Sequence, residues 1–228
     1  MNMSDTNRLK LEDPMGTTRS RRRLLHRSCG IVAWLAMPAL LPGVRAAAPS
    51  ARRLTPSQTE GPFYPRQLPT DSDGDLMRVG TRSAAQGQAT WLEGQVTDLQ
   101  GRPVRGARVE IWQCDRAGHY HHPGDGAAAD PDFQGFGHVM VDADGRYRFH
   151  TLRPAPYSGR TPHIHVKVRL AARELLTTQV YFEDEPGNAR DGLWQSLRDP
   201  TDRAALTVAF RQLADGALQA RFPIVVAA

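Results

Sequence analysis

The sequence of 228 residues has few cysteines, no long apolar run and no internal repeat. Of its two cysteines, Cys29 lies in a segment that we expect to be cleaved off. Cys114 is then the single cysteine of the mature chain, so a disulfide within that chain is excluded. We expect Cys114 to be a buried small residue rather than a metal ligand. The apolar run over residues 30–44 contains Pro38 and Pro42 and is too short to cross a membrane.

Most of the chain also lacks an excess of either charge sign. The formal charge of +5 comes from 29 basic and 24 acidic residues. Residues 1–48 hold eight of the basic and three of the acidic residues, so 21 of each remain in residues 49–228. A balanced chain of this kind does not indicate a nucleic-acid-binding protein.

Residues 1–48 are predicted to be a twin-arginine signal peptide. Arg21 and Arg22 precede two leucines, an apolar run follows, and Ala46-Ala47-Ala48 offers an A-x-A cleavage site. The alternative is a disordered basic tail before an apolar patch. We expect the precursor to use the Tat export machinery, and the mature protein to be periplasmic or extracellular after cleavage near Ala48.

The remaining chain is predicted to be all-β with little helix. Residues 49–90 are rich in Pro, Gly, Ser, Thr and Asp and indicate an extended arm that packs through Pro62, Phe63 and Tyr64. Residues 91–228 carry short alternating segments between turn signals, which predict a two-sheet β-sandwich. Expected strands include 104–112, 137–141, 147–151, 163–170, 175–182 and 222–226. Only residues 204–213 show helical spacing.

The most informative segment joins a tyrosine, an arginine and two histidines. His163 and His165 are two residues apart on a predicted strand, so both imidazoles point to one face and could bind a transition metal. Taken alone, the pair is equally compatible with one core histidine and one solvated histidine. Tyr157 and Arg160 stand directly upstream and favour a site.

Two tyrosines and two histidines could supply the ligands of one metal ion. The second tyrosine, Tyr120, follows a predicted strand, and Thr178–Tyr181 lies on the strand after the histidines. A phenol has a pKa near 10, so a strongly Lewis-acidic cation is needed to hold phenolate at neutral pH. Fe(III) meets this requirement, whereas Zn(II) and Cu(II) prefer imidazole, thiolate or carboxylate.

The chain resembles the intradiol ring-cleavage dioxygenases, of the protocatechuate 3,4-dioxygenase type, over nearly all of its mature length. The segments that carry the resemblance are TPSQTEGPFY (55–64), GQVTD (94–98), PVRGARVEIWQ (103–113), FQGFG (133–137), DGRYRF (144–149), PAPY (154–157) and RTPHIH (160–165). The strand-turn-strand text around residues 94–109 is shared by many β-sandwich modules. The tyrosine and histidine segments are far more specific.

The resemblance implies a non-haem Fe(III) site and roles for six residues: Tyr120, Tyr157, His163 and His165 as metal ligands, Tyr157 also as the ligand that leaves when substrate binds, Arg160 beside the bound catechol, and Gln179 behind the site. It implies that the substrates are O2 and a small catecholic aromatic, that the product is of the cis,cis-muconate type, and that the protein forms a homo-oligomer.

Two features depart from the family pattern. The loop between Tyr157 and His163 is short, with Ser158 and Gly159 where an aromatic residue is usual, and no helical N-terminal domain precedes the sandwich. Two alternatives remain open at this stage. One is a cupin-like enzyme that binds metal through His163, His165 and a third histidine such as His121. The other is a transthyretin-like surface module without catalytic activity.

Overall fold

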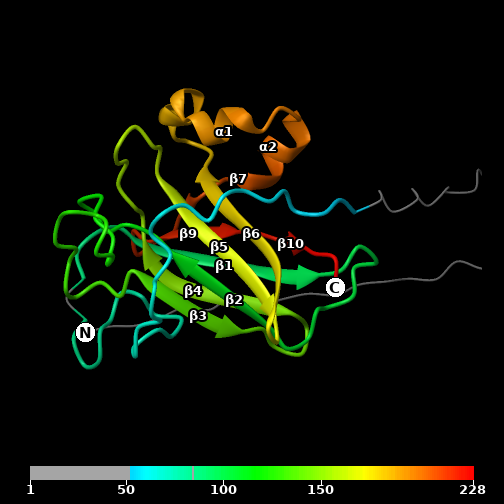
Figure 1. The fold of residues 1–228 in the computed structure, drawn as a ribbon, viewed down its shortest axis with the longest axis horizontal. Coiled ribbons are helices and arrows are strands. Elements are labelled where there is room, and N and C mark those ends of the chain that lie inside the picture. Colours follow the sequence, from blue (N-terminus) through cyan, green and yellow to red (C-terminus); the bar gives the residue numbers. More distant parts are fainter. Residues whose placement is uncertain (1–51, 84) are drawn as a thin grey trace, which may run out of the picture. The chain divides into compact units, whose positions relative to one another are not determined.

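Two β-sheets pack face to face in a computed structural model that describes residues 52–83 and 85–228 (Figure 1). The predicted signal peptide lies outside these residues. The first sheet is built around β1 (Ala89–Thr97), which pairs antiparallel with β4 (Arg146–Leu152). On its other edge β1 pairs in parallel with β9 (Leu218–Arg221) and then β10 (Ile224–Val225), and β9 pairs with β8 (Arg211–Gln212).

The second sheet carries the residues of interest. Its order is β3-β2-β5-β6-β7, comprising β3 (Phe136–Met140), β2 (Ala107–Trp112), β5 (His163–Leu170), β6 (Arg173–Phe182) and β7 (Thr207–Val208). All pairings are antiparallel except that between β6 and β7. The expected all-β sandwich with an extended arm and little helix is therefore confirmed.

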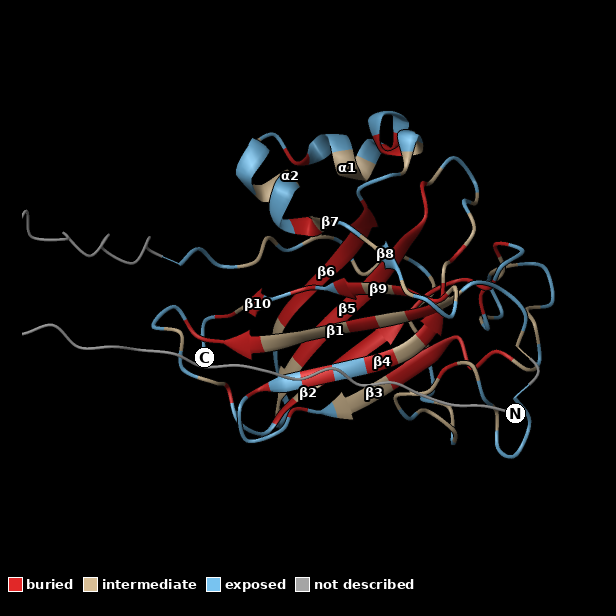
Figure 2. Cartoon of the chain, turned by 180° about the vertical axis from the view of Figure 1, so that it is seen from behind, coloured by how far each residue is buried: buried red, intermediate tan, exposed pale blue. Residues whose placement is uncertain are grey.

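The core follows from the two-residue period of the strands. On β5, Ile164, Val166 and Val168 point between the sheets and are fully buried. Figure 2 shows that burial runs along most of β2, β5 and β6. The alternate positions of β5 lie on the outer face of the same sheet, and His163, His165 and Lys167 among them are also buried.

The N-terminal arm covers part of that outer face. Backbone N–H groups of Thr55 and Gln58 donate to the carbonyls of Val225 and Thr177, so the arm spans the edge of the sandwich between the two sheets. It then crosses β6 and β5, where it appears in cyan in Figure 1. Phe63 and Tyr64 are half-buried as expected, but Pro62 is exposed and does not contribute to the packing.

Two expectations about the C-terminal region are wrong. Residues 204–213 do not form a helix: α2 (Pro200–Leu206) is capped by Asp199, and the chain then enters β7 and β8. The β-branched Thr207 and Val208 favour pairing with the end of β6. The strand expected at 222–226 is shortened to the two-residue β10, because Pro223 has no N–H to donate, and β9, which ends at Arg221, was not expected.

Two short elements precede α2. A 3-10 helix, η1 (Pro186–Arg190), leads directly into α1 (Gly192–Ser196), whose N-cap is Asp191. No helix among the described residues is long and apolar enough to span a membrane.

Candidate metal centre

The two histidines begin β5 on its outer face. The register pairs His163 with Tyr181 and His165 with Gln179 on β6, and it pairs His165 with Trp112 on β2. The Trp112 indole stacks on the His165 ring at 4.7 Å between centroids, with an interplanar angle of 11°. Strand pairing therefore fixes both imidazoles between neighbouring buried side chains.

A tight hairpin places Tyr157 relative to Arg160. Each residue donates its backbone N–H to the carbonyl of the other, at 3.2 and 2.7 Å. The two residues between them, Ser158 and Gly159, have φ values of 44° and 76°. Positive φ at both central positions is the geometry of a type I′ turn, which favours glycine. The short loop thus has a defined conformation.

The third chain segment supplies Tyr120 from the loop after β2. Asp115 and Asp125 organise this loop: Asp115 accepts from the backbone N–H groups of Ala117 and His119, and Asp125 accepts from that of Tyr120. From the arm, Phe63 stacks on the Tyr120 ring at 4.6 Å. Tyr120 is consequently almost fully buried.

The four expected ligands come together at one point. Tyr120 Oη lies 3.3 Å from Tyr157 Oη, which lies 3.5 Å from His163 Nε2, which lies 3.2 Å from His165 Nε2. Metal–ligand bonds of about 2 Å give neighbouring donor atoms separations of about 3 Å around a transition metal. The donor atoms therefore have the spacing of one coordination sphere.

The histidine tautomers also suit a metal. His163 Nδ1 lies 2.6 Å from the Thr161 carbonyl oxygen, so Nδ1 carries the proton and Nε2 presents its lone pair to the other three donors. Burial, followed by the charge of Arg160, lowers the pKa of His163 to about 4. Burial and His163 hold the pKa of His165 well below its usual value. Both rings are neutral near pH 7, as ligation requires.

The tyrosines, in contrast, need a cation in order to ionise. Burial is the main cause that raises the pKa of Tyr157, and burial together with the Tyr157 oxygen raises that of Tyr120 well above 10. A bound cation reverses this effect, because its charge stabilises phenolate at short range. The residues present fit a hard, strongly Lewis-acidic metal ion.

Arg160 lies beside the donor atoms and is held mainly by Asp191 and Gln179, with a longer contact of 3.5 Å to Tyr181 Oη. Its Nε donates to Asp191 Oδ2 at 2.7 Å, and its Nη2 donates to Gln179 Oε1 at 2.6 Å. The Gln179 amide in turn donates to the Thr59 carbonyl of the arm at 3.1 Å. Gln179 therefore contacts Arg160 and the arm, and the hydrogen bonds of its side chain go to neither histidine. A cavity of about 340 Å³ is lined by Tyr157, Arg160 and their hairpin.

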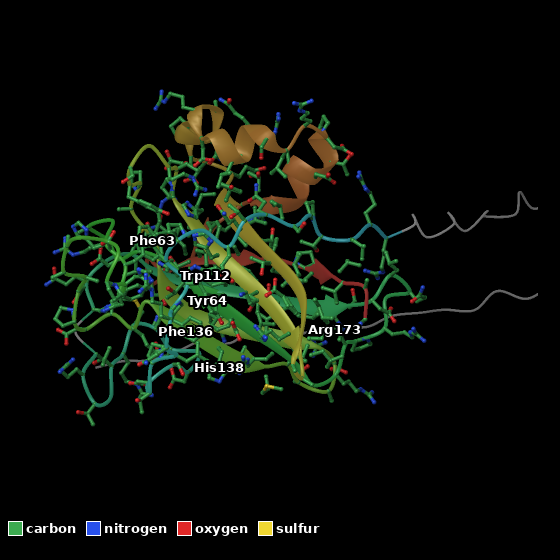
Figure 3. All side chains as sticks on the ribbon, viewed as in Figure 1. Phe63, Tyr64, Trp112, Phe136, His138 and Arg173 are labelled. Atoms are coloured by element: carbon green, nitrogen blue, oxygen red, sulfur yellow. The ribbon has the colours of Figure 1, made fainter. Side chains whose placement is uncertain are left out.

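Sequence reasoning missed Asp191 and did not predict several contacts around the site. Asp191 is fully buried yet gave no signal beyond an N-cap before a short helix. The Oη of Tyr181, in the segment 178–181 that the sequence analysis named, lies 2.9 Å from Gln58 Oε1 and 3.1 Å from Gln179 Oε1. On the same outer face, Phe63, Tyr64, Trp112 and Phe136 gather along the course of the arm (Figure 3), and the Tyr64 ring lies 5.0 Å from that of Trp112. These contacts depend on tertiary structure, which no local pattern reports.

Other candidate ligands lie elsewhere. The exposed His121 has its Nε2 2.9 Å from the Asp130 carbonyl oxygen, and among the described residues no three His, Cys, Asp or Glu side chains gather at a possible metal position. Cys114 is buried, and its sulfur lies 3.3 Å from the Ala155 carbonyl oxygen. The arrangement required for a three-histidine site is therefore not seen in residues 52–83 and 85–228.

The fold and the donor set define a β-sandwich with a candidate site for one metal ion on the outer face of one sheet. A family described as Dioxygenase matches residues 59–227, and the chain belongs to this family. It is 33% identical over 184 residues to the protocatechuate 3,4-dioxygenase alpha chain of Pseudomonas putida, covering 75% of this chain and 90% of that one.

Two further comparisons agree. The chain is 36% identical over 145 residues to the hydroxyquinol 1,2-dioxygenase of Corynebacterium glutamicum, covering 55% of this chain and 45% of that protein. It thus spans about half the length of that relative. The solved dioxygenase domain of a dioxygenase carbohydrate-binding protein fusion from Streptomyces sp. SirexAA-E superposes with a TM-score of 0.61 at 32% identity, covering 76% of this chain and 97% of that one.

Proposed function

We propose that this protein is a non-haem Fe(III) dioxygenase that opens a catechol ring between its two hydroxyl-bearing carbons. The observation that carries the proposal is the convergence of two phenol oxygens and two imidazole nitrogens, within 3.2–3.5 Å of their neighbours, beside the partly buried Arg160. Both atoms of O2 enter the product, a dicarboxylic acid of the cis,cis-muconate type.

In this proposal Tyr120, Tyr157, His163 and His165 hold the iron. When bound, ferric iron supplies a Lewis acid that holds the catechol oxygens and lowers the pKa of their hydroxyls. Tyr157 is the half-buried tyrosine and lines the cavity, so its phenolate oxygen accepts the proton of one catechol hydroxyl. Tyr120 remains buried beneath Phe63.

Arg160 is proposed to stabilise negative charge that develops on the ring and on the attacking oxygen. Its guanidinium is partly buried and fixed by two hydrogen bonds, so it is oriented before the reaction begins. We expect Arg160→Ala to keep the iron and the fold and to lower kcat by about 100- to 1000-fold, with a smaller effect on substrate binding. Arg160→Lys should restore only part of kcat, because a point charge does not reproduce a planar fork.

The substrate class is taken from the relatives, which are named for hydroxyquinol, protocatechuate and catechol. The proposed enzyme therefore acts on a small catecholic aromatic, and the cavity at the Ser158–Gly159 hairpin lies beside Tyr157.

The test is ring opening by iron-loaded protein under ¹⁸O2. We expect a red-brown protein, because phenolate-to-Fe(III) charge transfer absorbs visible light, and a product that carries both ¹⁸O atoms. Tyr157→Phe should shift the visible band and lower activity, whereas His121→Ala should change neither. An iron-loaded protein that opens the ring of none of hydroxyquinol, protocatechuate and catechol would overturn the proposal. So would a product that carries only one ¹⁸O atom. A colourless zinc protein would support the cupin-like alternative.

Two further expectations belong to the proposal. The precursor is exported by the Tat machinery, which carries folded proteins and so suits a protein that binds iron in the cytoplasm. The mature protein is a homo-oligomer, an idea supported by the similarity to both the alpha and beta chains of protocatechuate 3,4-dioxygenase. Sedimentation of the mature protein tests the second expectation.

A further inference from the structure

Asp191 is a fully buried carboxylate that accepts four hydrogen bonds. Its Oδ1 accepts from the backbone N–H groups of Leu193 and Trp194, at 2.9 and 3.1 Å, and these bonds cap α1. Its Oδ2 accepts from Arg160 Nε at 2.7 Å and from the Thr161 N–H at 2.9 Å. Capping explains only Oδ1, so the second oxygen serves another purpose.

The first purpose of Oδ2 is to fix the plane of the Arg160 guanidinium. A guanidinium is a rigid fork, and two bonds to fixed partners determine its orientation. Arg160 has these bonds at Nε, to Asp191, and at Nη2, to Gln179. Without Asp191, one of the two constraints on the fork is lost.

The second purpose concerns a metal ligand. Thr161 is held by the same Oδ2, and its side-chain hydroxyl donates to Asn188 Oδ1 at 3.0 Å. The carbonyl of Thr161 accepts the Nδ1 proton of His163 at 2.6 Å and thereby sets the tautomer of that ring. One carboxylate oxygen therefore fixes both the arginine and the backbone that orients His163.

We propose that Asp191 is a positioning residue for ring cleavage: it sets the plane of Arg160 and, through Thr161, the orientation of His163. This inference rests on the proposed function. Asp191 acts through its neighbours, since none of its four hydrogen bonds is to a metal-ligand side chain.

The kinetic test is a double-mutant cycle with iron-loaded protein and catechol. Asp191→Asn should lower kcat by about 100-fold with little change in KM, because displacement of a catalytic group by about 1 Å costs about this much. In an Arg160→Ala background the same substitution should have a clearly smaller effect on kcat, limited to the part that acts through Thr161 and His163. A matched control is Asp199→Asn, which changes the N-cap of α2 and should leave kcat unchanged.

A second measurement does not depend on iron. In metal-free protein the Arg160 Nε–H should give a slowly exchanging NMR resonance, assigned by its absence in Arg160→Lys. It should persist in Asp199→Asn and be lost in Asp191→Asn. Where Asp191→Asn fails to fold, Asp191→Glu keeps the charge but displaces the carboxylate, and should give an intermediate kcat.

The outcomes separate the two hypotheses. A native protein without ring-opening activity overturns the proposed function, and with it the role of Asp191 in the reaction. If the native protein is active, an unchanged kcat in Asp191→Asn overturns the positioning role alone. So does an equal loss of kcat with and without Arg160, because Asp191 would then act independently of the arginine.

Discussion

Lys167 provides the sharpest test of how the arm is held over the site. Its side chain is only 3% exposed, on the outer face of β5 two residues beyond His165. Its ammonium pairs with Glu60 of the arm, lies 3.3 Å from Glu174 Oε2, and lies 3.9 Å from the centroid of the Tyr64 ring. Lys167→Met removes the charge and keeps most of the apolar stem.

The size of the effect follows from the exposure of the partners. The Glu60 and Glu174 side chains are 43% and 46% exposed, so water can hydrate both carboxylates after the lysine charge is lost. Each ion pair then contributes about 0–1 kcal/mol. The desolvated cation–π contact adds about 1–2 kcal/mol. We therefore expect Lys167→Met to lower the free energy of unfolding by about 1–4 kcal/mol, which lowers Tm by about 2–4 °C for each kcal/mol.

Urea unfolding of metal-free protein measures this loss, and trypsin cleavage after the exposed Arg66 reports whether the arm has loosened. Arg173→Met, at the exposed start of β6, is the control and should stay within about 0.5 kcal/mol of the native protein. A Lys167→Met protein as stable as the native one, with unchanged cleavage at Arg66, would refute the reasoning. It would show that the cost of desolvating the Lys167 ammonium cancels its favourable interactions with Glu60, Glu174 and the Tyr64 ring.

Three further predictions concern the metal, acid stability and export. His163→Ala and His165→Ala should each abolish iron retention, measured by metal analysis after gel filtration, and unchanged iron in both would disprove the assigned site. Burial alone would raise the pKa of Asp191, but hydrogen bonds from Arg160 and from backbone N–H groups hold it below its usual value. The resulting stability is complete above about pH 4 and is lost as pH falls through the folded-state pKa, so Asp191→Asn should flatten the decline of Tm below about pH 4; an equally steep decline would show that other carboxyls cause it. Replacing Arg21 and Arg22 together by Lys should retain the uncleaved precursor in the cytoplasm, and normal processing would exclude the twin-arginine route.

The strands were predictable where apolar and polar residues alternate along the sequence. The expected strand at 163–170 coincides with β5, because Ile164, Val166 and Val168 supply the apolar face. The helix expected at 204–213 was wrong, because the apolar residues that are spaced as in a helix are divided among α2, β7 and β8. The β-branched pair Thr207 and Val208 was the local signal that the helix ends at Leu206.

The site was predictable only in part. The resemblance supplied Tyr120, Tyr157, His163 and His165, and the structure brings their donor atoms together. Asp191 could not be found from the sequence, since its partner Arg160 lies 31 positions away and nothing local marks the contact. An N-cap aspartate before a short helix is common, and only the tertiary structure shows that its second oxygen is used elsewhere.

The same strand builds the core and the candidate metal centre. Along β5, Ile164, Val166 and Val168 enter the core, while His163, His165 and Lys167 face the arm. A slip of one residue in the pairing with β2 or β6 would place imidazoles in the core and aliphatic side chains beneath the arm. The apolar face thus fixes the register that brings both imidazoles to the tyrosines. Since β2 and β6 pair with β5 along its length, burial of the core also positions Trp112 and Gln179 beside His165.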